Sequence, residues 1–242
     1  MRILVFSDIH GNLTALEAAL AEAGEIDAAW CLGDLVGYGP NPNECIARIR
    51  GLPDLQCIIG NHDAAALDLI DSDTFNPEAR AAILWTRKVL TDSSWNFLNN
   101  LPEKLELDGV TLAHGSPRHP VWEYLLDTRT ATLNFDFFTT PLCFVGHTHL
   151  PVVYTMHTDN HLAHLNIPEP NQKLVLPTRA IVNPGSVGQP RDRDPRAAFA
   201  IFEPETNTWD YRGVAYDIGE VQARMQGLGL PERHIHRLAA GW

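Results

Sequence analysis

The sequence has few cysteines, few basic residues and no long hydrophobic run. Its 242 residues include four cysteines, none of them in a Cys-x-x-Cys pair. No stretch approaches the roughly 20 apolar residues that a membrane-spanning helix needs. Lysine and arginine number 18 against 30 acidic residues, so the net charge is −12, and no basic run is present. These absences argue against a disulfide scaffold, a membrane protein and a protein that binds nucleic acid through its phosphates.

What is present predicts a cytoplasmic globular protein. The length is sufficient for one domain with a full core. The first predicted strand follows Met1-Arg2 directly, which leaves no room for a signal peptide. Three of the four cysteines lie in apolar runs, so we expect reduced thiols in the core. We expect a single domain over residues 1–242, with a helical insert at about 64–101 and a C-terminal tail or terminal helix after about 228.

Three segments in the first 63 residues share one pattern. Apolar runs at residues 3–6, 28–32 and 55–59 each end in a polar loop, and helical periodicity follows the first two. Strands that alternate with helices predict βαβ units in a parallel sheet. The loops carry Asp8 and His10, then Asp34, then Asn61. The carboxyl ends of parallel strands meet at one edge of a sheet, where ligands bind, so we expect these side chains to converge.

Residues 64–101 predict two helices without obvious chemistry. The first carries a 3.6-residue repeat formed by Ala81, Leu84, Trp85, Lys88 and Val89. Asp92 or Ser93 is expected to cap the second helix. Trp85 and Trp95 are expected to be core aromatics.

The remainder is rich in strand patterns. Asp108-Gly109 predicts a hairpin turn, residues 118–134 predict a loop-rich segment, and a helix is expected near 221–225. His161 and His164 are expected to face solvent. The strand patterns lie at residues 104–107, 110–113, 142–145, 152–156, 161–167, 173–176, 179–182, 197–202 and 209–214.

Polar side chains follow two of these later strands as well. His114 follows the run at 110–113, and His147 and His149 follow the run at 142–145. The five strand ends together present two carboxylates, four imidazoles and a carboxamide, from Asp8, His10, Asp34, Asn61, His114, His147 and His149. These are too many ligands for one ion, and they suit a binuclear site with a bridging carboxylate. Mixed oxygen and nitrogen ligands without thiolate favour manganese, iron, zinc or cobalt over copper or an iron–sulfur cluster.

In this order the blocks resemble the signature of the calcineurin-like metallophosphoesterases. The blocks are Asp8-Ile9-His10, Gly33-Asp34, Gly60-Asn61-His62-Asp63, His114 and Gly146-His147-Thr148-His149, and the resemblance covers roughly residues 1–190. Residues 33–39 and 183–186 most resemble the small bacterial phosphodiesterase branch. The resemblance implies an α/β fold, the four-layered α/β/β/α sandwich of two packed sheets flanked by helices. The residue patterns alone predict only a parallel α/β part followed by a β-rich part.

The resemblance also implies a role for each block. Asp8, His10, Asp34 and His149 would hold the first metal ion; Asp34 as bridge, with Asn61, His114 and His147, would hold the second. His62 would face the phosphate as general acid or charge stabiliser. A metal-bridging hydroxide would attack phosphorus directly, without a phospho-enzyme. Manganese is the expected metal, with iron, zinc, cobalt or nickel as alternatives.

One loop departs from the family's protein Ser/Thr phosphatases. Those enzymes carry Asp-Arg after their Gly-Asp, and the arginine binds phosphate, whereas residues 35–39 here contain neither. The carboxylate partner of the catalytic histidine is missing too. We therefore expect hydrolysis of a phosphodiester in a small diester or nucleotide. A phosphomonoesterase, a dinucleoside-polyphosphate hydrolase and a catalytically silent protein-binding scaffold are the alternatives. The candidates for a substitute phosphate contact are Arg118, Arg179, Arg191 and Arg193.

Several neighbouring residues admit two interpretations. Asp63 is either a hydrogen-bond partner of a histidine ligand or a helix N-terminal residue. Asn183-Pro184-Gly185-Ser186 is either a plain turn or a support for the site. Trp122 and Tyr124 either stack on a nucleobase or pack in the core or a lid. The oligomeric state is open, with a homo-oligomer as one alternative.

Overall fold

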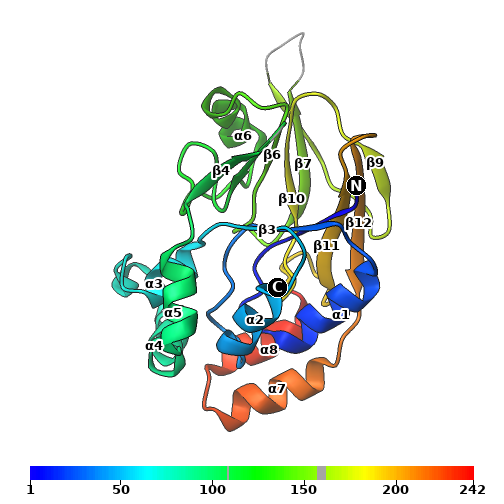
Figure 1. Cartoon of the computed structure of the whole chain (residues 1–242). Coiled ribbons are helices and arrows are strands. Elements are labelled where there is room, and N and C mark those ends of the chain that lie inside the picture. The colour runs from blue at the N-terminus through cyan, green and yellow to red at the C-terminus, as the bar shows by residue number, and fades with distance from the viewer. Residues whose placement is uncertain (108, 157–161) are drawn as a thin grey trace.

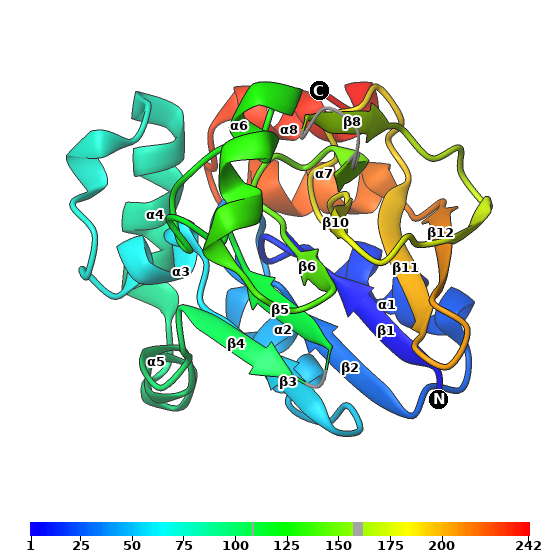
Figure 2. The same ribbon diagram turned by 90° about the horizontal axis from the view of Figure 1, so that it is seen from above.

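Two six-stranded sheets pack against each other, and helices cover their outer faces (Figures 1 and 2). The structure is a computed structural model that describes residues 1–107, 109–156 and 162–242. The predicted turn residue Asp108 and the predicted solvated His161 lie outside these ranges.

The elements follow the predicted order closely. The strands are β1 (Ile3–Phe6), β2 (Ala28–Cys31), β3 (Leu55–Cys57), β4 (Lys104–Leu107), β5 (Val110–Ala113), β6 (Leu142–Phe144), β7 (Pro151–Met156), β8 (Ala163–Asn166), β9 (Lys173–Val175), β10 (Ala180–Pro184), β11 (Ala197–Glu203) and β12 (Thr208–Val214). The helices are α1 (Leu13–Ala23), α2 (Pro42–Ile49), α3 (Asn61–Ala66), α4 (Pro77–Val89), α5 (Asp92–Asn99), α6 (Thr128–Asn134), α7 (Ile218–Gly227) and α8 (Glu232–Ala240), with 3₁₀ turns η1 (Ser72–Thr74) and η2 (Phe135–Phe137).

The first sheet joins the two ends of the chain. Its strand order is β3-β2-β1-β11-β12-β9, in which β1, β2 and β3 run parallel and the others pair antiparallel. All four residues of β1 and of β2 are buried, as expected for parallel strands covered on both faces. The predicted parallel βαβ part is therefore confirmed, and the loops after β1, β2 and β3 leave the sheet at one edge.

The second sheet has the order β4-β5-β6-β10-β7-β8. Its three central strands, β5, β6 and β10, are parallel, and the outer strands pair antiparallel. Consequently the loops after β5, β6 and β10 also leave from one edge. The sequence patterns predicted these strands but not their division between two sheets.

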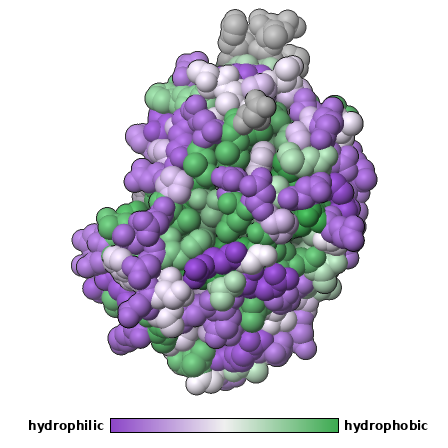
Figure 3. All heavy atoms as spheres, in the orientation of Figure 1, coloured by the Kyte–Doolittle hydropathy of each residue, from purple (hydrophilic) through white to green (hydrophobic). Residues whose placement is uncertain are grey.

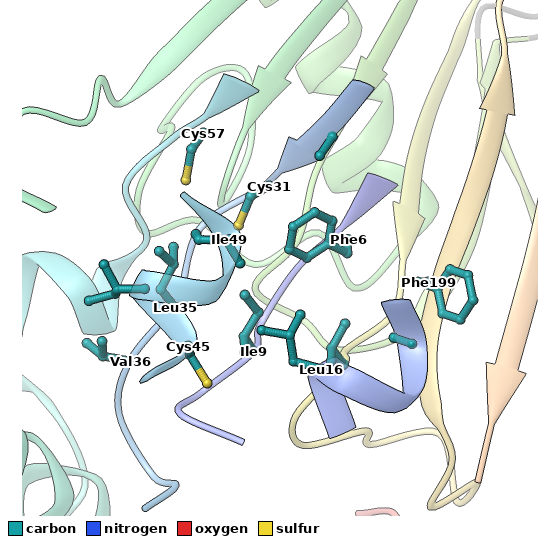
Figure 4. Packing of buried hydrophobic residues seen from close by; sticks show 14 of the residues in the cluster. Phe6, Ile9, Leu16, Cys31, Leu35, Val36, Cys45, Ile49, Cys57 and Phe199 are labelled. Carbon is teal, nitrogen blue, oxygen red and sulfur yellow. The ribbon is translucent and has the colours of Figure 1, made fainter. Parts of the chain in front are cut away.

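Apolar side chains fill three layers. Between the sheets, Trp30, Phe144 and Trp209 are buried, with Phe144 4.9 Å from Trp209 between ring centroids. Phe6 and Leu16 belong to the layer that packs α1 and α2 on the first sheet (Figure 4). A third cluster packs α6 and η2 on the second sheet. This arrangement is the four-layered α/β/β/α sandwich, as predicted.

The four cysteines are buried and free, which confirms the expected reduced core thiols. Figure 4 shows three of them within the layer beside α2.

The face seen in Figure 3 has apolar residues along its middle and hydrophilic residues around them. Within the described ranges, none of the helices has the length and apolar character required to cross a membrane.

The helical segment at 61–99 differs from the prediction in detail. Thr91 caps α5 by accepting a hydrogen bond from Ser94 N, so neither Asp92 nor Ser93 is the cap. Trp85 packs partly buried near α7 and α8, but Trp95 is 41% exposed, and its expected core position is wrong. The short helix α5 buries Ser94 and Leu98 instead. The buried face of α4 is formed by Ala79, Ala82, Ile83 and Thr86.

Two later segments are more ordered than expected. The segment predicted as loop-rich contains α6, which Asp127 caps by accepting from Thr130 N. After residue 228 the chain forms α8, which packs on α7 through Met225 and Leu238, so the terminal-helix alternative is correct and the tail is wrong.

Candidate metal centre

The predicted ligands converge where the loops of both sheets meet. Asp8, His10 and His149 form one group whose ligand atoms lie within 4.8 Å of one another, and Asp34, His114 and His147 form a second. Asn61 joins the second group, with its Oδ1 3.0 Å from His114 Nε2. All seven side chains are at most 2% exposed. We call this cluster the metal edge.

The loops adopt a backbone conformation that is rare outside glycine. Asp8, His10, Asp34, His147 and His149 have φ between 50° and 65°. Such left-handed residues cost about 1–3 kcal/mol each and persist where the surroundings over-determine them. Hydrogen bonds between the loops hold this conformation: His10 N donates to Asp34 O at 2.9 Å, and His147 N donates to Asp8 Oδ2 at 3.1 Å. The strain is concentrated at the metal edge, as is typical of functional sites.

Second hydrogen bonds orient the four imidazoles. In His10, His114 and His149 the Nδ1 atom lies 2.6–3.1 Å from a backbone carbonyl oxygen, and in His147 the Nε2 atom lies 3.2 Å from Trp122 O. A carbonyl accepts only, so each of these nitrogens carries the proton. When the ring is neutral, its other nitrogen keeps a lone pair and faces the cluster. This tautomer pattern is the one found in metal-binding histidines.

The carboxylates provide the test of whether a cation fits. One oxygen of each accepts a backbone hydrogen bond: Asp8 Oδ2 accepts from His147 N, and Asp34 Oδ1 accepts from His62 N at 2.8 Å. Within the described structure, the other two oxygens, Asp8 Oδ1 and Asp34 Oδ2, are buried without a hydrogen-bond donor. Each faces imidazole Nε2 atoms at 3.4–3.8 Å. Buried orphan anions that face lone-pair nitrogens fit divalent cations.

Burial controls protonation in the cluster. Burial lowers the pKa of His10 and of His149 well below the usual value and raises the pKa of Asp8 to about 7. Burial alone would also lower the pKa of His114, but the charge of Asp34 outweighs it and raises that pKa to about 9. Neutral imidazoles and ionised carboxylates are the metal-binding forms, so cations and protons compete for these positions.

Asp63 belongs to the scaffold of the loops. Its Oδ1 accepts from Val36 N and its Oδ2 from Gly60 N, both at 3.0 Å. It lies in the first turn of α3 and accepts no hydrogen bond from a histidine, so the helix N-terminal interpretation is correct. Gly60 is required for space, because a Cβ there would lie 2.1 Å from Asp34 Oδ1.

The turn at residues 183–186 supports the metal edge. Asn183 Nδ2 donates to Gly146 O at 2.6 Å and to Thr148 Oγ1 at 3.1 Å. Ser186 Oγ donates to Asp8 O at 2.9 Å. The turn therefore holds the loop of Asp8 and the loop of His147 and His149 together, which favours the supporting role over a plain turn.

His62 is placed beside the ligands and is oriented by aromatic packing. Its ring centroid lies 4.4 Å from that of Tyr38 and 5.0 Å from that of Phe75, which meets it edge-on. No carboxylate is among its side-chain hydrogen-bond partners, and its Nδ1 is buried without one in the described structure. The rings of Tyr38 and Phe75 therefore pack against His62 where the carboxylate partner is missing. His62 also lies within 4.8 Å of His10 and Asp34 ligand atoms, so its distance alone also allows a ligand role.

Of the four candidate arginines, Arg191 lies at the metal edge. Its Nη2 donates to Tyr38 Oη at 3.4 Å and to Gln189 Oε1 at 3.2 Å, and its charge acts on Asp8 and several of the histidines. Arg118 is paired with Glu123, and Arg179 donates to three backbone carbonyls. Arg193 is exposed, with its backbone N–H on Gly241 O.

Aromatic side chains cover the cluster. Tyr124 stacks on His147 at 3.8 Å between centroids, and Trp122 meets Phe75 edge-on at 5.0 Å. Trp122 is 39% exposed and Tyr124 46%, so neither is a core residue. We call the covering side chains the rim: Tyr38, Phe75, Trp122, Tyr124 and Arg191. Sequence analysis missed Tyr38 and Phe75. Tyr38 lies in the loop that departs from the Ser/Thr phosphatases, which was the available signal for it, and no pattern marked Phe75.

Known proteins are similar to this chain in fold and in sequence. A family model described as the calcineurin-like phosphoesterase superfamily domain matches residues 1–207. A crystal structure of a metallophosphoesterase from Sphaerobacter thermophilus is 47% identical, covers 100% of this chain and 99% of its own, and superposes with a TM-score of 0.91. An uncharacterized protein of Methanocaldococcus jannaschii is 39% identical over 99% of this chain and 98% of its own length.

A more distant relative has a named activity. The symmetrical bis(5'-nucleosyl)-tetraphosphatase of Pectobacterium carotovorum is 31% identical over 104 residues, which span 36% of this chain and 37% of that protein. The full-length similarities and the family model agree with the clustered aspartates and histidines. The chain belongs to the calcineurin-like phosphoesterase superfamily, whose members are dimetal-dependent phosphoester hydrolases.

Proposed function

We propose that this protein hydrolyses phosphodiesters at the metal edge with two divalent ions. The observation that carries the proposal is the pair of three-residue groups at the metal edge, one containing Asp8 and the other Asp34. In the described structure each group has a buried carboxylate oxygen without a hydrogen-bond donor. Asp8, His10, Asp34 and His149 would hold one ion, and Asp34, Asn61, His114 and His147 the other. We propose manganese as the metal, with iron, zinc, cobalt or nickel as alternatives.

Side chains of the protein would bind the phosphate and assist the leaving group beside the metal ions. When bound, the ions would activate a water and polarise the phosphoryl group. His62, held between Tyr38 and Phe75, would stabilise or protonate the leaving oxygen. Arg191 would contact the phosphate in place of the missing loop arginine, because its guanidinium is the one beside the cluster. Water would attack phosphorus directly, without a phospho-enzyme.

A dinucleoside-polyphosphate hydrolase is the second candidate. The partial match to the symmetrical bis(5'-nucleosyl)-tetraphosphatase favours it. The half-exposed rings of Trp122 and Tyr124 beside the metal edge would suit a nucleobase. In either case the substrate is a small phosphorylated molecule. We further propose that the protein is one catalytic domain that acts in the cytoplasm, which is consistent with its four free buried thiols.

The first experiment compares the Mn²⁺-dependent rates on bis-p-nitrophenyl phosphate and p-nitrophenyl phosphate. We expect kcat/KM to be higher for the diester. A monoester preference would overturn the phosphodiesterase in favour of a phosphomonoesterase. Metal content after reconstitution is measured in parallel. If the protein retained no divalent ion, the proposal that it is an enzyme would be overturned in favour of a protein-binding scaffold.

A further inference from the structure

The C-terminal helix α8 brings unpaired positive charge to the rim. It lies beyond residues 1–207, the part that the family model covers. His234 on α8 packs on Tyr38 with 4.3 Å between ring centroids, and Tyr38 receives the hydrogen bond from Arg191. Arg237 follows one helical turn after His234, on the same side of the helix. The charges of Arg191 and Arg237 act on each other directly.

These two guanidinium groups lack counter-ions in an acidic protein. In the described structure neither forms an ion pair, and the Nε atom of each is buried without an acceptor. Arg237 feels the charge of Glu78 on α4 but makes no ion pair with it. Seven other arginines of the described structure are paired with carboxylates: Arg48, Arg80, Arg87, Arg118, Arg196, Arg212 and Arg224.

The loop and the helix that carry the two arginines are fastened to each other. Arg193 N donates to Gly241 O at 2.6 Å, two residues along the chain from Arg191. Gly241 ends α8 with φ 64°, and a Cβ there would lie 2.8 Å from the backbone of Asp194. A contact this close requires glycine. The backbones that carry Arg191 and Arg237 are therefore fastened to each other. Two like charges brought together in this way cost free energy unless an anion joins them.

We infer that Arg237, together with Arg191, forms a subsite for a second anionic group of the substrate, next to the phosphoryl group at the metal edge. Arg191 would contact both groups. This inference rests on the proposed function. Guanidinium groups bind phosphate oxygens through charge-assisted hydrogen bonds, and two of them suit a doubly charged group. The substrate would then carry a second phosphate beside the scissile phosphoryl group, as a nucleoside or dinucleoside oligophosphate does.

The test measures binding rather than turnover, with two ligands that cannot be hydrolysed. Methylphosphonate and methylenediphosphonate are titrated calorimetrically into the protein loaded with excess Mn²⁺, and metal content is checked after each titration. We expect the wild-type protein to prefer the diphosphonate by about tenfold or more, the size of one charge-assisted contact. Arg237→Gln should reduce that preference to about twofold and leave the affinity for methylphosphonate unchanged.

The matched control is Arg233→Gln, which removes an exposed arginine from the same helix. It should keep the preference for the diphosphonate. If both variants lost the preference for the diphosphonate equally, the preference would come from the overall positive charge of the helix, and the subsite would be overturned. Methylphosphonate binding without a diphosphonate preference would overturn the subsite alone. Failure of the metal-loaded protein to bind either ligand would overturn the proposed function and the subsite with it.

Discussion

The metal edge and the rim above it are built in opposite ways. Ligands of the metal edge sit on short loops directly after strands, and each side chain is fixed by a second hydrogen bond or a strained backbone. Side chains of the rim are long or aromatic, come from segments far apart in the chain, and are held by ring contacts. The metal edge therefore suits chemistry shared by a family, and the rim suits the choice of substrate.

The largest effect should come from Asp34, whose Oδ2 lies 3.6 Å from His10 Nε2 and 3.4 Å from His114 Nε2, one histidine of each group at the metal edge. Asp34→Asn removes the carboxylate charge while keeping the shape. We expect kcat to fall by about 10³-fold or more, the upper range for losing one electrostatic stabiliser. Elemental analysis should show loss of bound metal in the same variant. Retention of both ions with normal kcat would show that Asp34 does not bridge.

His62 contacts both regions: it lies near His10 and Asp34 of the metal edge and packs against Tyr38 and Phe75 of the rim. Its substitution therefore tests whether it belongs to the metal ligands or to the rim. His62→Ala should lower kcat by about 10²-fold, as for removal of a general acid. Both ions should remain, because the seven proposed ligands are intact. Metal content separates the roles: loss of an ion from this variant would make His62 a ligand, which its distance from Asp34 allows.

Within the rim, Arg191 should affect binding more than the chemical step. Arg191→Gln should raise KM for bis-p-nitrophenyl phosphate by about tenfold, the cost of one hydrogen bond to a charged group. Arg193→Gln is the matched control, since Arg193 is exposed and two residues away. If the two variants behaved alike, the phosphate contact assigned to Arg191 would be wrong.

His234 packs on Tyr38 of the rim, and substituting it should change the pH dependence of the free energy of unfolding. Burial lowers its pKa to about 3, and its ring is buried beside Tyr38. The unfolded chain therefore binds a proton below about pH 6.5 that the folded chain does not, and stability falls as pH decreases from there towards 3. His234→Phe should lose less stability than the wild type between pH 7 and 5, by about 2 kcal/mol or less in urea unfolding. Identical pH dependence would show that His234 takes up its proton when folded.

The smallest effect should come from a cap remote from both regions. Thr91→Ala removes the side-chain acceptor for Ser94 N at the start of α5. We expect a loss of about 1 kcal/mol in the free energy of unfolding. The kinetic constants on the diester should stay unchanged. A change in kcat would mean that the helical segment communicates with the metal edge.

Local patterns predicted most of the secondary structure and failed where tertiary contacts decide. Strands with buried apolar runs were found within a residue or two. The seven-residue helix α6 was missed because three of its residues are threonines, which have low helix propensity, and its packing against the second sheet stabilises it. Trp95 was misplaced because an aromatic residue on a short helix is not necessarily on its buried face.

The sequence by itself determined the metal edge. A polar residue placed directly after a strand is carried to the sheet edge by the strand, so chain order and strand ends were enough to bring Asp8, Asp34 and His114 together. Only the tertiary structure decided the rim. Tyr38, Arg191 and Arg237 are 46 or more residues apart, and no period or motif links them. Tyr38 and Arg191 meet across two loops, and α8, whose His234 packs on Tyr38, carries Arg237 to the same region. Side chains that meet through packing leave no local pattern in the sequence.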